Sequence, residues 1–212
     1  SLSNMAIELG GKFGFTPVDE VVTDYVDERS DGDYDVVRSD DDAEYEAEYD
    51  IDASEITPKV SKPHRVGNVD DVENVTDVEL DQVFIGSCTD GKYEDLKRAA
   101  EILEGHTVAR GTRLVVTPAS REIHTRLAKE GLIEVLNDAG AVVTNSTCGA
   151  CPGRGLGVLG DGEVCLSAMN RNFKGRMGSD DSEIYLSSPQ TAATSAITGH
   201  ITPPGSLREV RP

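Results

Sequence analysis

From residue 82 onward, short apolar runs alternate with stretches whose apolar residues recur at helical spacing. The apolar runs predict five strands, at 82–87, 112–118, 141–145, 163–168 and 183–188. The helical spacing predicts four helices, at 93–105, 120–131, 131–140 and 188–199. Strands separated by helices are typical of an open, mostly parallel sheet with helices on both faces. The sequence therefore predicts a fold of the α/β class.

The N-terminal part of the chain lacks this alternation. Residues 5–9 predict a short helix that ends at Gly10 and Gly11. Residues 56–64 contain two prolines and predict an extended connector. The chain opens without Met on an apolar, glycine-containing stretch, which we expect of the interior of a longer protein.

Acidic residues are concentrated between 19 and 55, where 17 Asp and Glu face two Arg, a local net charge of −15. One interpretation is a solvated, mobile loop or linker. The other is adaptation to molar salt, because the Debye length falls to about 3 Å at 1 M and self-repulsion becomes tolerable. The net charge of −19 and the scarcity of Lys, 7 against 13 Arg, lead to the hypothesis of a halophilic source.

Composition also excludes several classes of protein. The negative charge argues against a nucleic-acid partner, which requires a basic patch. No run approaches the ~18 apolar residues of a membrane span, and no secretory signal is recognisable. Four cysteines in 212 residues are too few for a disulfide scaffold. We therefore expect a cytoplasmic protein with reduced thiols and no membrane partner.

Three of the four cysteines follow predicted strands. Cys88 comes directly after the first strand, and Cys148 and Cys151 come after the third. Because the carboxyl ends of parallel strands meet at one edge of a sheet, we expect these three thiols to face one crevice. Cys165 lies inside an apolar strand and is predicted to be a buried core residue.

Spacing alone leaves the kind of thiol site open. A zinc site would need a fourth ligand from His124, His200 or water, and neither His has ligand spacing to the cysteines. Cys148 and Cys151 could instead form a dithiol redox pair. The third alternative is an iron–sulfur cluster held by three thiolates, which leaves one iron open as a Lewis acid. The fourth alternative is that the thiols bind no ligand.

Two arginines follow the strand that contains Cys165. Arg171 and Arg176 lie on a glycine-containing loop beyond that strand's end. Arginine binds carboxylates through paired hydrogen bonds, although ion pairs with the acidic segments are the simpler interpretation. An open iron beside two arginines would suit a hydroxy-polycarboxylic acid.

Three motifs, "IGSCTDGKYEDL", "TCGACPG" and "NRNFKGR", occur in this order and resemble the aconitase superfamily. Within it, they are most similar to the branch of 3-isopropylmalate dehydratase and homoaconitase large subunits. The segments "SNMAIELGGKFGF", "KPHRVGNV" and "LSSPQTAATSAITGHI" also fit, whereas residues 24–55 are atypical. Asp90 stands where the family often has Asn. The chain therefore resembles the C-terminal half of a large subunit.

The resemblance implies a division of the chain into three parts. Residues 1–23 would be the tail of a preceding aconitase-type α/β domain. Residues 24–63 would be an acidic, variable linker. Residues 64–212 would be a cluster-binding α/β domain similar to domain 3 of the aconitases.

The resemblance also implies roles for individual residues. A 4Fe-4S cluster would be ligated by Cys88, Cys148 and Cys151. The substrate pocket would be lined by Asn170, Arg171 and Arg176, with the arginines holding carboxylates. Asn4 and Glu8 would be catalytic residues near the cluster, Glu8 assisting the hydroxyl at the open iron; the simpler interpretation of these two is capping and helix-surface polarity.

The implied activity is that of an iron–sulfur hydro-lyase of leucine biosynthesis. It would isomerise 2-isopropylmalate and 3-isopropylmalate by dehydration and rehydration. Alternatives are a homoaconitase, a methylmalate or citraconate hydratase, an aconitase, or a non-catalytic fragment that binds zinc or a cluster. Implied partners are a small swivel-domain subunit, the N-terminal half of the large subunit and a hydroxy-di- or tricarboxylic acid. The family's acid–base residues lie on those partners, so we expect this chain to be inactive alone.

Overall fold

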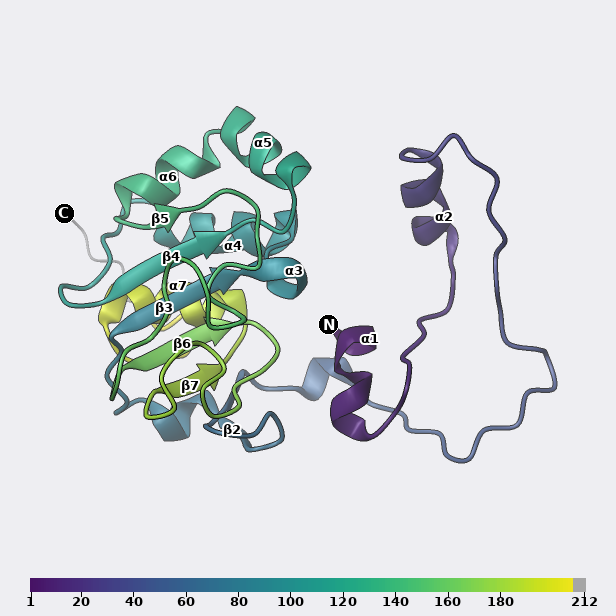
Figure 1. Cartoon of the computed structure of the whole chain (residues 1–212), viewed down its shortest axis with the longest axis horizontal. Helices are drawn as coiled ribbons and strands as arrows, with labels where there is room; N and C mark the ends of the chain where they lie inside the picture. The colour runs from purple at the N-terminus through teal and green to yellow at the C-terminus, as the bar shows by residue number, and fades with distance from the viewer. Residues whose placement is uncertain (208–212) are drawn as a thin grey trace. The chain divides into compact units, whose positions relative to one another are not determined.

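A seven-stranded sheet organises the C-terminal part of the chain (Figure 1). The computed structural model describes residues 1–207, which divide into one unit at 2–56 and another from 57 onward. The strand order in the second unit is β2-β1-β7-β6-β3-β4-β5. The strands are β1 (Lys59–Ser61), β2 (Val69–Asp71), β3 (Gln82–Gly86), β4 (Arg113–Thr117), β5 (Val142–Val143), β6 (Val164–Ala168) and β7 (Glu183–Leu186).

Strands β3 to β7 pair in parallel, which confirms the predicted α/β class and mostly parallel sheet. Strand β1 pairs antiparallel with β7 at one edge, and β2 pairs antiparallel with β1. Strand β1 lies inside the segment 56–64 that the sequence predicted as a connector. Three residues between prolines are too few to show a strand period, so this pair depends on the free edge that β7 offers.

Four longer helices form where helical spacing predicted them. They are α4 (Tyr93–Leu103), α5 (Arg121–Lys129), α6 (Leu132–Asp138) and α7 (Pro189–Thr198). The Ser120 hydroxyl accepts a hydrogen bond from the Ile123 amide and starts α5, as its N-cap position predicted. Ser188 caps α7 in the same way, with Pro189 in the first helical turn.

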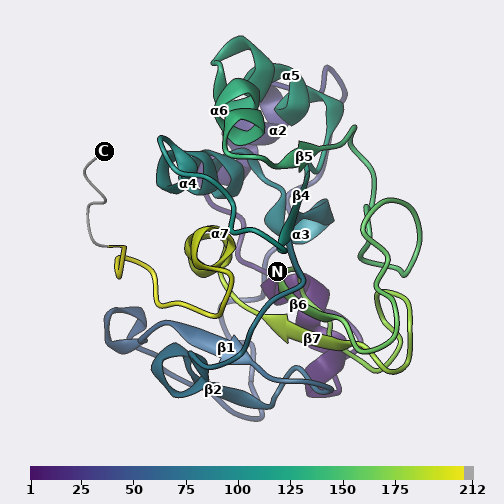
Figure 2. The same ribbon diagram turned by 90° about the vertical axis from the view of Figure 1, so that its left-hand side faces the viewer.

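The two faces of the sheet are covered differently (Figure 2). Val83 and Ile85 of β3 point into a hydrophobic cluster with α4, α5, α6 and α7. Phe84 points to the other face, into a smaller cluster that the loops 144–163 and 169–182 complete. The prediction of helices on both faces is therefore corrected for the second face. Its cover contains six glycines between 144 and 163, and glycine disfavours helix.

The N-terminal unit has little regular structure. It contains α1 (Leu2–Met5), the 3₁₀ helix η1 (Ala6–Leu9), α2 (Glu20–Asp27) and the 3₁₀ turn η2 (Ala53–Glu55). Helical structure ends at Gly10, as predicted for residues 5–9, and Gly10 adopts the left-handed conformation. Helix α2 was not predicted; Asp19 caps it by accepting a hydrogen bond from the Val22 amide. Residues 28–52 form neither helix nor strand and are exposed.

Two shorter elements complete the described part. The 3₁₀ helix η3 spans Val72–Val75, and the one-turn helix α3 spans Ser87–Asp90. Among the described residues, no helix is long and apolar enough to span a membrane.

Candidate functional site

The carboxyl ends of four parallel strands lie along one edge of the sheet. The register pairs Gly86 of β3 with Thr117 of β4, and Ile85 with Ala168 of β6. Val143 of β5 continues the same edge beside β4. The segments that carry Cys88, Cys148 with Cys151, and Asn170 with the arginines all follow these ends. Ligands of open α/β sheets bind at this edge.

A tight turn takes the chain from β3 into α3 and presents Cys88. Gly86 has φ +145°, and a Cβ there would collide with the carbonyl oxygen of Thr117. Ser87 has φ +73°, the single positive φ among the described non-glycine residues. Such backbone strain is found mostly at functional sites. The turn leaves Cys88 exposed one residue after a buried serine.

The Cys148–Cys151 loop packs directly on the same strand ends. Gly149 has φ +56°, and a Cβ there would lie 2.8 Å from Thr117 Oγ1 and 2.9 Å from the ring of Phe84. Thr117 is therefore contacted both by the turn before Cys88 and by the loop of Cys148. Cys148 is exposed, whereas Cys151 is buried, with 7% of its surface accessible.

The loop between β6 and β7 carries Asn170, Arg171 and Arg176. Asn170 is buried, and both arginines are half-buried. Arg176 Nη2 donates to Cys151 Sγ at 3.3 Å. This loop is also joined to the cysteine loop through the backbone, because the Leu159 amide donates to the Met177 carbonyl at 2.9 Å.

Asn172 is a buried residue of this loop that the sequence reasoning did not assign. Its Nδ2 donates to the carbonyl oxygen of Lys62 at 2.9 Å and so anchors the loop beside β1. The signal available in the sequence was an amide side chain two residues after Asn170, between two arginines. Asn172 therefore positions the loop.

Several buried polar atoms at this edge have no hydrogen-bond partner. They are Ser87 Oγ, Ser146 Oγ and Arg176 Nε. Ser87 directly precedes Cys88, and Ser146 lies two residues before Cys148. An unsatisfied buried polar group costs about 1–3 kcal/mol, so these groups indicate a place built for a further polar partner.

This donor set fits a cluster better than a single ion. Within the described residues, no three His, Cys, Asp or Glu side chains are grouped to hold a metal ion. The zinc alternative with His124 or His200 therefore lacks an assembled ligand set. In a cluster, each thiolate binds a different iron, so three thiols must surround a wider space. Three free thiols that follow neighbouring strand ends, beside unsatisfied hydroxyl and guanidinium groups, supply the donor chemistry of such a cluster.

The fourth cysteine and the acidic residue beside the first differ from the three thiols. Burial raises the pKa of Cys165 to about 12, so its thiol stays protonated inside the core. Burial likewise raises the pKa of Asp90, while a hydrogen bond from Thr89 acts in the opposite direction. Cys165 is thus a core residue, as its place in a strand predicted.

Asn4 and Glu8 lie in the N-terminal unit. Asn4 is exposed in α1, and Glu8 is half-buried in η1. Their catalytic roles stay predictions.

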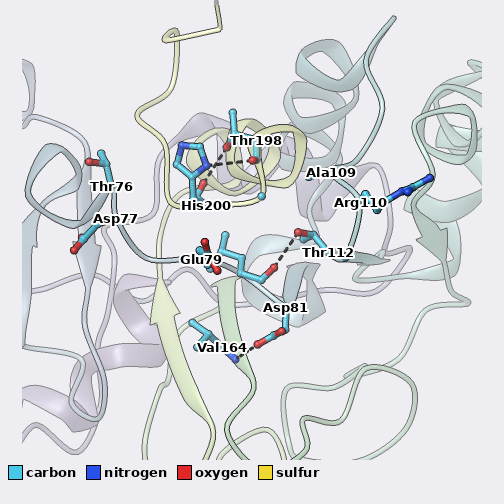
Figure 3. A pocket seen from close by; sticks show the side chains of 13 residues that line it. Thr76, Asp77, Glu79, Asp81, Ala109, Arg110, Thr112, Val164, Thr198 and His200 are labelled. Atoms are coloured by element: carbon cyan, nitrogen blue, oxygen red, sulfur yellow. Dashed lines mark hydrogen bonds between the residues drawn. The ribbon is translucent and has the colours of Figure 1, made fainter.

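A separate hollow of about 640 Å³ lies at the opposite, amino edge of the sheet (Figure 3). Asp81 precedes β3 and accepts a hydrogen bond from the Val164 amide at 2.8 Å. Thr112 precedes β4 and donates to the Leu80 carbonyl at 2.9 Å. These contacts fix the starts of the strands, and none of the predicted site residues lines this hollow.

Comparison with known proteins identifies the family. The model of the aconitase family (aconitate hydratase) matches residues 1–78 and 69–199. The large subunit 1 of 3-isopropylmalate dehydratase from Methanopyrus kandleri is 52% identical over 203 residues, which are 96% of this chain and 49% of that protein. The 2,3-dimethylmalate dehydratase large subunit from Eubacterium barkeri is 48% identical over 208 residues, 98% of this chain and 50% of that protein. The chain spans about half the length of the curated relatives it matches, and it belongs to the aconitase family.

Proposed function

We propose that this chain is the cluster-binding half of the large subunit of a hydro-lyase that interconverts 2-isopropylmalate and 3-isopropylmalate. One observation carries the proposal: three thiols follow the same sheet edge, beside a loop with two half-buried arginines. The name of the Methanopyrus kandleri relative supports the choice of substrate. The reaction removes water across two neighbouring carbons and returns it with the hydroxyl on the other carbon.

Cys88, Cys148 and Cys151 are the residues that would hold a 4Fe-4S cluster. When bound, the cluster supplies an iron that can act as a Lewis acid toward a substrate oxygen. The unsatisfied hydroxyls of Ser87 and Ser146 are then available as hydrogen-bond donors around it.

The loop after β6 would bind the substrate carboxylates. The guanidinium groups of Arg171 and Arg176 offer planar pairs of N–H donors that match a carboxylate. Arg176 Nε is buried without a hydrogen-bond partner, so its N–H is suited to donate to a substrate carboxylate in the complex. Asn170, which is buried beside them, would orient the substrate.

Asn4 and Glu8 would be further catalytic residues. Glu8 would hold or release a proton at the departing substrate hydroxyl, and Asn4 would hydrogen-bond beside it. The segment 24–63 would serve as the linker between the tail 1–23 and the domain 64–212.

Partners supply what this chain lacks. The relatives are named as large subunits, which implies a small subunit as partner. We infer that this small subunit and the N-terminal half of the large subunit contribute the remaining acid–base residues, and that the assembly works in the cytoplasm. The halophilic source remains part of this proposal and rests on the acidic composition.

A second substrate has specific support. The 2,3-dimethylmalate dehydratase large subunit of Eubacterium barkeri is 48% identical to this chain, which lies within the range of 46–52% for the isopropylmalate dehydratases. Both substrates are branched hydroxy-dicarboxylic acids, so the same arginines could serve either.

The test is turnover by the assembled enzyme. The full-length large subunit, loaded anaerobically and mixed with the small subunit, is given 3-isopropylmalate, 2,3-dimethylmalate, homocitrate or citrate. We expect the highest kcat/KM for 3-isopropylmalate, loss of activity in Cys148→Ser and its retention in Cys165→Ala. A fully loaded complex that turns over none of these acids would refute the proposal.

A further inference from the structure

Arg176 contacts the cysteine loop at two points. Its guanidinium Nη2 lies 3.3 Å from Cys151 Sγ. Its backbone carbonyl oxygen lies 3.3 Å from the place where a Cβ on Gly153 would stand, so only a residue without a side chain fits there comfortably. Both contacts fall within the segment that contains Cys151; the side chain of Arg176 makes the first and its backbone makes the second.

The backbone around Arg176 makes this contact rigid. The Arg176 amide donates to the Phe173 carbonyl at 2.9 Å, which closes a turn. The next residue, Met177, is fully buried, and its carbonyl accepts from the Leu159 amide. The Cα of Arg176 is therefore already fixed beside the cysteine loop, and only the rotamer freedom of the side chain is lost when the guanidinium bonds to Cys151.

The sulfur of Cys151 has few competing partners. Cys151 is buried, whereas Cys88 and Cys148 are exposed and can be hydrated. A charged donor in a partly buried place forms a stronger hydrogen bond than a neutral or solvated one. The three thiols are therefore unequal, and Cys151 is the one held by a cation.

We propose that Arg176 is a positioning residue for Cys151: its Nη2–H···Sγ bond orients the sulfur for cluster binding and persists once the cluster is bound. The proposal rests on the proposed function and adds a role that is separate from carboxylate binding. Arg176 has five N–H donors, so one bond to sulfur leaves others, including the unpartnered Nε, for a substrate.

A hydrogen bond to a ligand sulfur has measurable consequences. Such bonds raise the reduction potential of iron–sulfur clusters and stabilise the ligand set. The loop of the substrate-binding arginines and the loop of two cluster ligands would then act as one unit.

The first experiment uses the chain without a cluster. The guanidinium ¹⁵N and ¹H signals of Arg176 are followed by NMR in the wild type, in Cys151→Ala and in the matched control Cys148→Ala. We expect the Arg176 signals to shift and their exchange with solvent to quicken in Cys151→Ala only. Identical Arg176 signals in all three proteins would overturn the proposal.

The second experiment uses the loaded full-length large subunit. Arg176→Gln removes the charge, Arg176→Lys keeps it without the planar donors, and Arg154→Gln is the control, an exposed arginine of the cysteine loop. We expect a ~10-fold or greater loss of cluster affinity and a lower midpoint potential in Arg176→Gln, because removing an outer partner of a metal ligand typically has effects of that size. Arg176→Lys should recover part of both, and Arg154→Gln should match the wild type.

The outcomes separate this proposal from the function. If NMR shows the bond between Arg176 and Cys151 but the wild type binds no cluster, the proposed function fails. The claim that this bond persists in the cluster-bound protein then fails with it. If the wild type loads and Arg176→Gln keeps its potential and affinity, the positioning role alone is overturned. Thermal melts of each variant establish whether it is folded. If Arg176→Gln does not fold, Arg176→Lys is compared with the wild type instead.

Discussion

Replacing Gly149 with alanine tests how the cysteine loop is seated. Gly149 combines a positive φ of +56° with a closely packed surface beneath it. The new Cβ would lie 2.8 Å from Thr117 Oγ1 and 2.9 Å from the Phe84 ring, and both side chains are fully buried. Neither can rotate away into solvent, so either the loop or the core must move.

The expected cost has two parts. A left-handed conformation costs a residue with a side chain about 1–2 kcal/mol. Overpacking a buried contact costs about 1–3 kcal/mol more. Gly162→Ala is the matched control, because Gly162 has φ +75° and a Cβ there meets nothing within 4 Å. The difference between the two variants therefore isolates the contact with Thr117 and Phe84.

Two measurements show which part moves. If the core gives way, the Tm of Gly149→Ala should fall below that of Gly162→Ala by roughly 2–12 °C, from the overpacking energy and the size of the chain. If the loop moves, the Tm values stay close and Gly149→Ala loses cluster binding after anaerobic reconstitution. Equal Tm and equal cluster content in both variants would refute the seating of the cysteine loop on these two residues.

Three further predictions follow from other parts of the chain. Cys165 should resist a thiol reagent at pH 8 until the protein unfolds, because burial raises its pKa to about 12, and labelling of the native protein would contradict this. The contribution of the buried thiol to stability is complete below the ordinary thiol pKa of 9.0 and is lost as the pH rises toward 12. Asn172→Ala should lower the free energy of unfolding by about 1–3 kcal/mol in denaturant titrations, because it removes the hydrogen bond from the Asn172 amide to the part-buried Lys62 carbonyl. Asn145→Ala, at an exposed position, should have little effect. The Tm should rise between dilute buffer and molar KCl, because salt screens the net charge of −19; no gain would argue against the halophilic hypothesis.

The elements with strong local patterns could be predicted from the sequence. Strand β4 was expected at 112–118 and spans Arg113–Thr117, because four consecutive buried residues carry its signal. Helix α7 was expected at 188–199 and spans Pro189–Thr198, because Ser188, Pro189 and Gly199 mark its ends. Local chemistry determines these boundaries, so they do not depend on the rest of the fold.

Elements that depend on distant partners could not be predicted. Strand β1 has three residues and exists because it pairs with β7 and β2. The cover of the second sheet face is made of loops, whose positions are set by contacts such as the hydrogen bond from Gln82 Nε2 to the Gly157 carbonyl. Such contacts join residues far apart in the sequence and leave no periodic signal.

The candidate site divides in the same way. The placement of Cys88, Cys148 and Cys151 at one edge of the sheet could be predicted from topology, because each comes after a parallel strand. The strained turn at Ser87, the anchor at Asn172 and the bond between Arg176 and Cys151 do not, since each depends on how two segments pack. The proposal of a 4Fe-4S cluster came from the resemblance, because thiol spacing alone also allowed zinc or a redox pair.

We propose that the three thiols hold a 4Fe-4S cluster, and the content of iron and acid-labile sulfide per chain is the first quantity to measure. The full-length protein is reconstituted anaerobically in molar KCl as wild type, Cys148→Ser and Cys165→Ala. We expect about four iron and four sulfide per chain in the wild type and in Cys165→Ala, and loss of both in Cys148→Ser. Stoichiometric zinc without sulfide in the wild type would contradict it.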